Sequence, residues 1–261
     1  MTGPLENKIA LITGAAQGIG RAIAKRLAAD GAHIAVADID MAGAQRVVDE
    51  LTETGRRAVA LKCDVSEQES VHLAVRECED SLGGLDIMIN NAGVAQVLPL
   101  SDVTPADLNR LTAINIGGVL WGIQASAESF IRRGVRGKII NAASIAAHSG
   151  QPIFGVYSAT KFAVRGLTQS AAQELARYGI TVNGYSPGTV DTGMWEEIDR
   201  ILSERDGVPL GESFAKQAAQ ITLGRPETAE DVAGFVAYLA GPDSDYMTGQ
   251  SPLIDGGMLF V

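Results

Sequence analysis

The stretch "TGAAQGIG", residues 13–20, decides the fold, because it joins two segments of different periodicity. The apolar run "IALIT" leads into it, and "RAIAKRLAAD" follows with apolar residues at three- and four-residue spacing. This order indicates a strand, a glycine turn and a helix. Gly14, Gly18 and Gly20 would allow the backbone to turn sharply and to approach a pyrophosphate at the N-terminus of that helix.

The glycine spacing is Gly-x3-Gly-x-Gly, whereas the common dinucleotide fingerprint is Gly-x-Gly-x2-Gly. A tight connection without a ligand is therefore the alternative interpretation. The position directly after the first expected strand favours a dinucleotide site.

The same alternation of apolar bursts and amphipathic stretches continues along the chain. We expect strands at residues 9–13, 33–38, 58–64, 85–90, 138–144, 180–186 and 251–255. Each burst is short and apolar on both faces, which is typical of parallel strands covered by helices on both sides. The sequence therefore predicts a single α/β domain over residues 1–261, a doubly wound Rossmann fold with a seven-stranded parallel sheet.

Residues 188–226 break this rhythm with helical segments and loose Gly/Pro turns before a further expected helix near 227–240. An insertion at the carboxyl end of a parallel strand lies where such sheets bind ligands. We interpret it as a small substrate lid, with a plain structural connection as the alternative.

Composition narrows the class of function. The chain has 46% apolar and 20% charged residues and a net charge of −10, which opposes nucleic-acid binding. Its two cysteines, Cys63 and Cys78, lack CxxC spacing, so we expect reduced thiols in a cytoplasmic protein and no metal site. The apolar runs are too short to span a membrane.

Asp38 ends the second expected strand, 24 residues after Gly14. A carboxylate there can accept hydrogen bonds from both hydroxyls of an adenosine ribose and repel a 2′-phosphate, which predicts NAD as the cofactor. A helix N-cap is the alternative role. Asp64 and Val65, and then Asn91, Ala92 and Gly93, follow the third and fourth strands at the same edge, where they would flank the adenine and its ribose.

Ser144 closes the fifth expected strand, and Tyr157 and Lys161 follow one helical turn apart, about 6 Å along the helix axis. A tyrosine has a pKa of about 10, so proton exchange at neutral pH requires a nearby cation that favours the phenolate. The pattern predicts that Lys161 lowers the pKa of Tyr157, that Tyr157 exchanges a proton with a substrate oxygen, and that Ser144 hydrogen-bonds that oxygen. Asn115 is expected mid-helix, either binding a water that links Lys161 to solvent or as a satisfied buried amide.

The motifs "TGAAQGIG", "NNAG", "YSATK" and "SPGTVDT", with Asn115 and Ser144, resemble the short-chain dehydrogenase/reductase family over nearly the whole chain. The resemblance implies a homotetramer with Asn115, Ser144, Tyr157 and Lys161 as catalytic residues. It also implies that Pro187, Gly188, Val190 and Thr192 hold the nicotinamide carboxamide and its phosphate. Together, the expected cofactor-binding residues are Gly14, Gln17, Gly18, Ile19, Gly20, Asp38, Asp64, Val65, Asn91, Ala92, Gly93, Tyr157, Lys161, Pro187, Gly188, Val190 and Thr192.

The stretches "GVLWGIQAS", "GMWEEIDRILSERDGVPLGESF" and "MTGQSPLIDGGMLF" are similar to the acetoin(diacetyl) reductases, also called 2,3-butanediol dehydrogenases. This closer resemblance implies an NAD-dependent interconversion of a vicinal diketone, hydroxyketone and diol. It places the substrate against Ile145, Gln151 and Trp195, besides Ser144 and Tyr157. The polar Gln151 departs from the apolar residue expected in the L-specific enzymes, and Trp195 could instead only anchor the lid.

Other functions fit parts of the pattern. A polyol dehydrogenase or a broad-specificity carbonyl reductase would share the fold, but Ile145 and Trp195 should crowd out a six-carbon chain. An acyl-carrier-protein reductase would need NADP and a basic docking face, which Asp38 and the net charge oppose. A nonenzymatic NAD-binding scaffold would need a broken catalytic set, and the four expected positions are intact.

Overall fold

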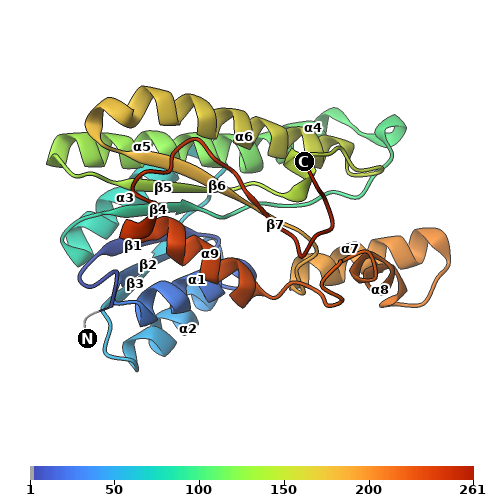
Figure 1. The fold of residues 1–261 in the computed structure, drawn as a ribbon, viewed down its shortest axis with the longest axis horizontal. Coiled ribbons are helices and arrows are strands. Elements are labelled where there is room, and N and C mark those ends of the chain that lie inside the picture. Colours follow the sequence, from blue (N-terminus) through green and yellow to red (C-terminus); the bar gives the residue numbers. More distant parts are fainter. Residues whose placement is uncertain (1–2) are drawn as a thin grey trace.

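The computed structural model describes residues 3–261. Within this range, seven parallel strands form one sheet in the order β3-β2-β1-β4-β5-β6-β7 (Figure 1). The strands are β1 (Ile9–Thr13), β2 (His33–Asp38), β3 (Ala58–Lys62), β4 (Ile87–Asn90), β5 (Lys138–Ala142), β6 (Thr181–Pro187) and β7 (Leu253–Ile254). The seven-stranded, doubly wound parallel sheet predicted from the sequence is confirmed.

Two strands, β3 and β5, end two residues earlier than expected. β3 stops at Lys62 because Asp64 begins a turn, in which its carboxylate accepts hydrogen bonds from the backbone N–H and the hydroxyl of Ser66 at 3.0 and 2.7 Å. β5 stops at Ala142, and Ser144 instead caps a short 3₁₀ helix at Ile145–Ala147. Asp64, Val65 and Ser144 therefore lie in loops just beyond the sheet edge rather than within it.

Helices cover both faces of the sheet, as predicted. In Figure 1, α5 and α6 lie above the sheet, and α1, α2 and α9 lie below it. The helices are α1 (Gly18–Ala29), α2 (Met41–Thr52), α3 (Gln68–Leu82), α4 (Pro105–Leu111), α5 (Gly118–Arg133), α6 (Gly155–Leu175), α7 (Gly193–Asp206), α8 (Glu212–Ala218) and α9 (Ala229–Ala240). No helix within residues 3–261 is both long enough and apolar enough to cross a membrane.

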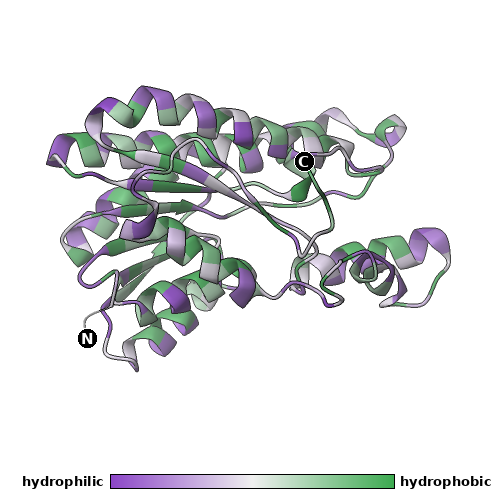
Figure 2. Cartoon of the chain, in the orientation of Figure 1, coloured by the Kyte–Doolittle hydropathy of each residue, from purple (hydrophilic) through white to green (hydrophobic). Residues whose placement is uncertain are grey.

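Each face of the sheet has its own hydrophobic core. One core packs α1, α2 and α9 against the sheet, and the other packs α3, α5 and α6 against the opposite face. All five residues of β1 are buried, because this strand lies in the middle of the sheet with helices on both sides. Figure 2 shows the result: hydrophobic strands at the centre, and helices that alternate between hydrophobic and hydrophilic residues.

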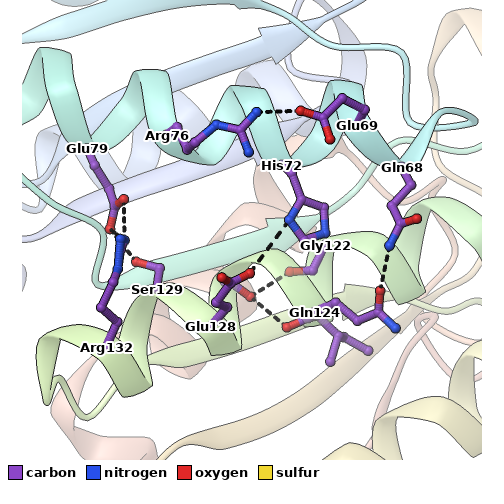
Figure 3. A network of polar contacts seen from close by, with 12 residues as sticks. Gln68, Glu69, His72, Arg76, Glu79, Gly122, Gln124, Glu128, Ser129 and Arg132 are labelled. Atoms are coloured by element: carbon purple, nitrogen blue, oxygen red, sulfur yellow. Dashed lines mark hydrogen bonds and ion pairs between the residues drawn. The ribbon is translucent and has the colours of Figure 1, made fainter.

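α3 and α5 are also joined by a polar network at their outer edge (Figure 3). Glu79 of α3 accepts hydrogen bonds from Arg132 at 2.6 and 2.7 Å and from Ser129 at 2.6 Å, both on α5. Nearby, Nδ1 of His72 lies 3.8 Å from a carboxylate oxygen of Glu128. This network ties the two helices together on the surface.

The expected insertion leaves the carboxyl edge after β6 and contains α7 and α8, which project beyond the sheet in Figure 1. A parallel β-bridge between Val190 and Glu227 closes its base. Asp199 of α7 is buried and accepts a hydrogen bond from the backbone N–H of Gly211 and another, at 2.9 Å, from that of Phe214. The two helices therefore form one internally bonded unit, and its role as a substrate lid stays a prediction.

Candidate active site

A cavity of about 1030 Å³ lies at the carboxyl edge of the sheet, between the strand ends and α7–α8. It forms there because the loops after the parallel strands all meet at this edge. Every residue predicted from the sequence to bind cofactor or substrate lines this cavity. Of the four predicted catalytic residues, Ser144, Tyr157 and Lys161 line it and Asn115 does not.

The glycine turn after β1 adopts the conformation that its sequence suggests. Gly14 and Gly18 have φ values of 64° and 54°, in the left-handed region that favours glycine. A Cβ atom on Gly14 would lie 2.8 Å from the Cα atom of Ala92, so a side chain there would collide with the loop after β4. Gly14 is thus required both by its φ value and by the close approach of the next loop, and Gly18 by its φ value alone.

The N-terminus of α1 opens onto the cavity without a competing anion. Its N-cap residue, Gln17, makes no side-chain hydrogen bond to the helix, and the first turn contains no acidic residue. The N–H groups of the first turn of a helix have no partners within the helix, and its dipole favours negative charge there. A phosphate group fits this position.

The turn is held from behind by Asn91, whose side-chain amide donates hydrogen bonds to the carbonyl oxygens of Thr13 and Gly14, both at 3.0 Å. The Asn91 Oδ1 atom accepts a hydrogen bond from the hydroxyl of Tyr185 at 2.9 Å. Tyr185 is fully buried on β6, and burial raises the pKa of its hydroxyl. Tyr185 is not among the residues predicted from the sequence, because no local pattern links β6 to the turn after β1.

Asp38 ends β2 at the cavity, as expected. Its two carboxylate oxygens accept hydrogen bonds from the backbone N–H groups of Ala16 and Asp40, each at 2.9 Å. The predicted alternative, an N-cap, is filled by Asp40, which accepts a hydrogen bond from the backbone N–H of Gly43 at the start of α2. The carboxylate of Asp38 is thus fixed in place, and carboxylate oxygens have further lone pairs for ribose hydroxyls.

Ser144, Tyr157 and Lys161 all line the cavity, Ser144 from the loop after β5 and the other two from the first turns of α6. The Lys161 Nζ atom lies 5.7 Å from the centroid of the Tyr157 ring and donates a hydrogen bond to the carbonyl oxygen of Ala142 at 2.8 Å. The hydroxyl of Ser144 accepts a hydrogen bond from the backbone N–H of Ala146 at 3.1 Å, which leaves its hydrogen free to donate.

Burial controls the pKa values of both titratable groups. The protein around the Tyr157 hydroxyl excludes water and raises its pKa, while the Ser144 hydroxyl acts in the opposite direction. Burial lowers the pKa of Lys161 to about 8. The expected lowering of the Tyr157 pKa by Lys161 stays a prediction: in the structure burial raises this pKa, the Ser144 hydroxyl opposes the rise, and Lys161 donates its hydrogen bond to Ala142.

Asn115 lies in a π-helical segment, Thr112–Gly117, between α4 and α5. Its side-chain amide donates to the carbonyl oxygen of Val94 at 2.9 Å and to Thr160 at 3.0 Å, and its oxygen accepts from the N–H of Val94 at 2.9 Å. The side chain is thus a satisfied buried amide, the second of the two expected alternatives. Its part in a proton relay stays a prediction, for which the π-helical backbone, a form frequent at functional sites, is the remaining support.

The predicted substrate residues lie at the end of the cavity nearest α7. Trp195 lines the cavity and also packs edge-to-face on Phe214 of α8, with 5.8 Å between ring centroids. It therefore anchors the α7–α8 unit while presenting a face to the cavity. Gln151 makes one weak side-chain hydrogen bond, to Ser149 at 3.4 Å, so its amide remains available to a ligand.

Several apolar residues complete this end of the cavity and were not singled out in the sequence. They come from the loop after β4, the loop before α6, the first turn of α7 and the C-terminal tail: Val94, Ala95, Ile153, Phe154, Met194, Met258 and Leu259. Ile153 has a φ of 60°, which is strained for a β-branched residue and places the 151–154 loop against the cavity. The tail reaches the rim because Asp255 accepts hydrogen bonds from the backbone N–H groups of Gly257 and Leu259.

The cysteines are buried, and burial raises the pKa of both thiols to about 12, so neither is a thiolate at neutral pH. Among residues 3–261, no group of three or more His, Cys, Asp or Glu side chains is arranged to hold a metal ion. A dinucleotide fits the groups that are present. The turn at Gly14 and the open start of α1 suit its phosphates, and Asp38 suits its ribose.

Comparisons with known proteins agree with this geometry. Residues 8–202 match the family model described as short chain dehydrogenase. The chain is similar to an L-2,3-butanediol dehydrogenase of Corynebacterium glutamicum, with 51% identity over 97% of this chain and 99% of that protein. It is similar to a diacetyl reductase [(S)-acetoin forming] of Staphylococcus epidermidis, with 46% identity over 97% of this chain and 99% of that protein.

A solved structure gives the same fold. The crystal structure of a blue fluorescent protein from a metagenomic library, in complex with NADPH, superposes with a TM-score of 0.86. It is 36% identical to this chain, and the match covers 98% of this chain and all of that one (100%). On the sheet topology, the cavity at its carboxyl edge and these matches, the chain is an oxidoreductase that belongs to the short-chain dehydrogenase family.

Proposed function

We propose that the protein is an NAD-dependent oxidoreductase that interconverts a secondary alcohol and a ketone, with acetoin, diacetyl and 2,3-butanediol as its substrates. The observation that carries this proposal is the convergence of Ser144, Tyr157 and Lys161 in the same cavity as the glycine turn and Asp38. That arrangement brings a proton-exchanging phenol close to the site that fits a dinucleotide.

In the proposed mechanism, Tyr157 exchanges a proton with the substrate oxygen, and Ser144 donates a hydrogen bond to the same oxygen. The nicotinamide, when bound, supplies or accepts the hydride. The raised pKa of Tyr157 favours the protonated phenol, which is the form that donates a proton during ketone reduction. Alcohol oxidation needs the phenolate, and the Lys161 ammonium, present below pH about 8, favours that form.

We propose NAD rather than NADP because of Asp38. Its fixed carboxylate lies where the adenosine ribose is expected, and its charge would repel a 2′-phosphate. The solved relative that holds NADPH belongs to the same fold, so cofactor choice within it depends on local residues such as this one.

The proposed four-carbon substrate rests on the cavity wall and on the relatives. Apolar Ile145 and Trp195 suit the methyl groups of a small vicinal diketone, and Gln151 could hydrogen-bond its second oxygen. Because the two curated relatives carry L- and (S)- in their names, we propose that the alcohol centre formed has the S configuration.

Turnover of a substrate panel tests this proposal. Diacetyl, acetoin, the 2,3-butanediol stereoisomers, a six-carbon sugar alcohol and a larger aryl ketone would each be offered with NAD(H) and NADP(H). We expect efficient turnover of the C4 vicinal compounds with NAD(H). Preference for the sugar alcohol would instead favour a polyol dehydrogenase, preference for the aryl ketone a broad carbonyl reductase, and cofactor binding without any turnover a nonenzymatic scaffold.

We further propose a cytoplasmic homotetramer, as the family resemblance implies. The many exposed apolar side chains, among them Leu108 and Phe162, would be covered in such an assembly. Light scattering of the purified protein measures its mass in solution and decides whether it is a tetramer.

A further inference from the structure

The backbone stem that leads from β6 into α7 is bound on one side by a single residue, Glu227. The backbone N–H of Glu227 donates to the carbonyl oxygen of Thr189 at 3.1 Å, and its carbonyl oxygen accepts from the N–H of Asp191 at 2.9 Å. Its Oε2 atom accepts a hydrogen bond from the backbone N–H of Gly188 at 2.8 Å. The same N–H also donates to the carbonyl oxygen of Ile254 at 3.1 Å. Backbone and side chain of Glu227 thus both bind the stem at 188–191.

Glu227 is an unusual residue for such a position. It is only 6% exposed, and its Oε1 atom has no hydrogen-bond partner among the described residues. Burial raises the pKa of its carboxyl group to about 8. Of the charged groups around it, Asp231 at the start of α9 and Asp255 after β7 act in the same direction, and Arg225 opposes them. The carboxyl group is therefore mostly protonated and neutral at pH 7.

The stem at 188–191 both lines the cavity and connects the sheet to α7–α8. Pro187, Gly188 and Val190 line the cavity, and the resemblance to the family assigns them to the nicotinamide end of the cofactor. The same stem directly precedes α7, and Glu227 follows α8 in the chain. The β-bridge between Val190 and Glu227 therefore joins the two ends of the α7–α8 unit at its base. Two residues after Glu227 the chain enters α9, which packs closely against α1, the helix whose start opens onto the cavity.

We propose that Glu227 is a positioning residue: it holds the 188–191 stem, and the base of α7–α8, in the geometry that receives the nicotinamide end of the cofactor. The expected effect of Glu227 on the KM for NAD⁺ rests on the proposed function. A residue that served only general stability would change the unfolding temperature without changing cofactor affinity selectively.

The test compares Glu227→Ala and Glu227→Gln with a matched control, Asp86→Ala. Asp86 also accepts a hydrogen bond from a backbone N–H, that of Ile9 at 2.9 Å, but at the amino end of β1, away from the cavity. We expect Glu227→Ala to raise the KM for NAD⁺ roughly tenfold, the size that losing a buried hydrogen bond gives, and the KM for butanediol much less. Glu227→Gln keeps the acceptor oxygen and should restore the wild-type KM, and Asp86→Ala should leave it unchanged.

If Glu227→Ala does not fold, Glu227→Asp replaces it, because the side chain shortened by one methylene would not reach Gly188. The proposal is overturned if the folded variant keeps the wild-type KM for NAD⁺, or if Asp86→Ala raises it equally. Trypsin cleavage at Arg200, Arg205 and Lys216 provides a readout that needs no ligand. We expect it to be about tenfold faster in Glu227→Ala than in the wild type, since about 1.4 kcal/mol shifts an opening equilibrium tenfold.

The two readouts separate this inference from the proposed function. A wild-type protein that neither binds NAD(H) nor turns over C4 substrates refutes the proposed function, while cleavage of α7–α8 still reports whether Glu227 holds the stem. Unchanged cleavage and unchanged KM in an active enzyme refute the inference alone.

Discussion

At the residue scale, Tyr157 and Lys161 show why a pair of residues must be judged in its environment. Their spacing on α6 predicts an attraction that lowers the Tyr157 pKa. The structure adds burial, which raises the pKa of the phenol and lowers that of Lys161 to about 8. The sequence could predict which residues meet, but not the direction in which burial shifts their pKa values, because burial depends on the whole cavity.

Replacing Lys161 with Met should separate activity from stability. The folded-state pKa of about 8 lies below the ordinary 10.5, so the unfolded chain binds more protons between these values and burial of Lys161 destabilises the protein below pH 8. We expect Lys161→Met to raise Tm at pH 7 and to lower kcat at least about a hundredfold, the scale of acid-base catalysis. Calorimetry and steady-state kinetics measure both; an unchanged kcat contradicts the assigned role.

Asp38 and Asp40 provide a matched test of cofactor choice. Asp38→Asn removes the charge that would repel a 2′-phosphate, so the KM for NADP⁺ should fall about tenfold or more, an effect of about 1.4 kcal/mol. Asp40→Asn removes a charge two residues away, at the exposed N-cap of α2, and should leave the preference for NAD⁺ unchanged. Equal effects of the two variants would show that general charge, not the Asp38 site, sets the preference.

At the element scale, the polar network between α3 and α5 in Figure 3 should contribute to stability and not to turnover. Burial tends to raise the pKa of Glu79, but hydrogen bonds from Arg132 and Ser129 outweigh it and the net pKa is lowered. Its contribution is therefore present above the ordinary pKa of 4.5 and is lost as pH falls below it.

Glu79→Ala should lower stability at pH 7 by about 1–2 kcal/mol, and Tm accordingly, with kcat unchanged. Glu69→Ala is the control, because Glu69 forms an ion pair with Arg76 and its own side chain is 83% exposed. Such a pair is worth less than about 1 kcal/mol. Thermal unfolding at pH 7 and pH 4 measures both variants; equal losses at both values of pH would contradict the ionic contribution of Glu79.

The local sequence pattern predicts where the strands lie, but not where β3 and β5 end. The strand positions follow from apolar bursts, and all seven observed strands begin within two residues of the expected start. β3 and β5 end early because the polar side chains of Asp64 and Ser144 bond to nearby backbone groups instead of continuing the sheet. Such local competition is decided by side-chain geometry that periodicity does not contain.

At the scale of the whole molecule, the carboxyl edge of the parallel sheet explains why distant motifs form one site. Glycines after β1, Asp38 after β2 and Ser144 after β5 meet there because strand direction is shared. The supporting residues could not be predicted in this way. Tyr185 acts on Asn91 across 94 positions of sequence, and Glu227 acts on Gly188 across 39, with no local signal for either contact.

The account depends most on Tyr157 as the residue that exchanges a proton with the substrate. The most direct measurement is the turnover of diacetyl with NADH by Tyr157→Phe, with NADH binding measured by fluorescence on the same sample. We predict that kcat falls at least about a hundredfold. The dissociation constant for NADH should stay within a few-fold of the wild type, because Phe keeps the ring that lines the cavity. Turnover at the wild-type rate by this variant would contradict the account.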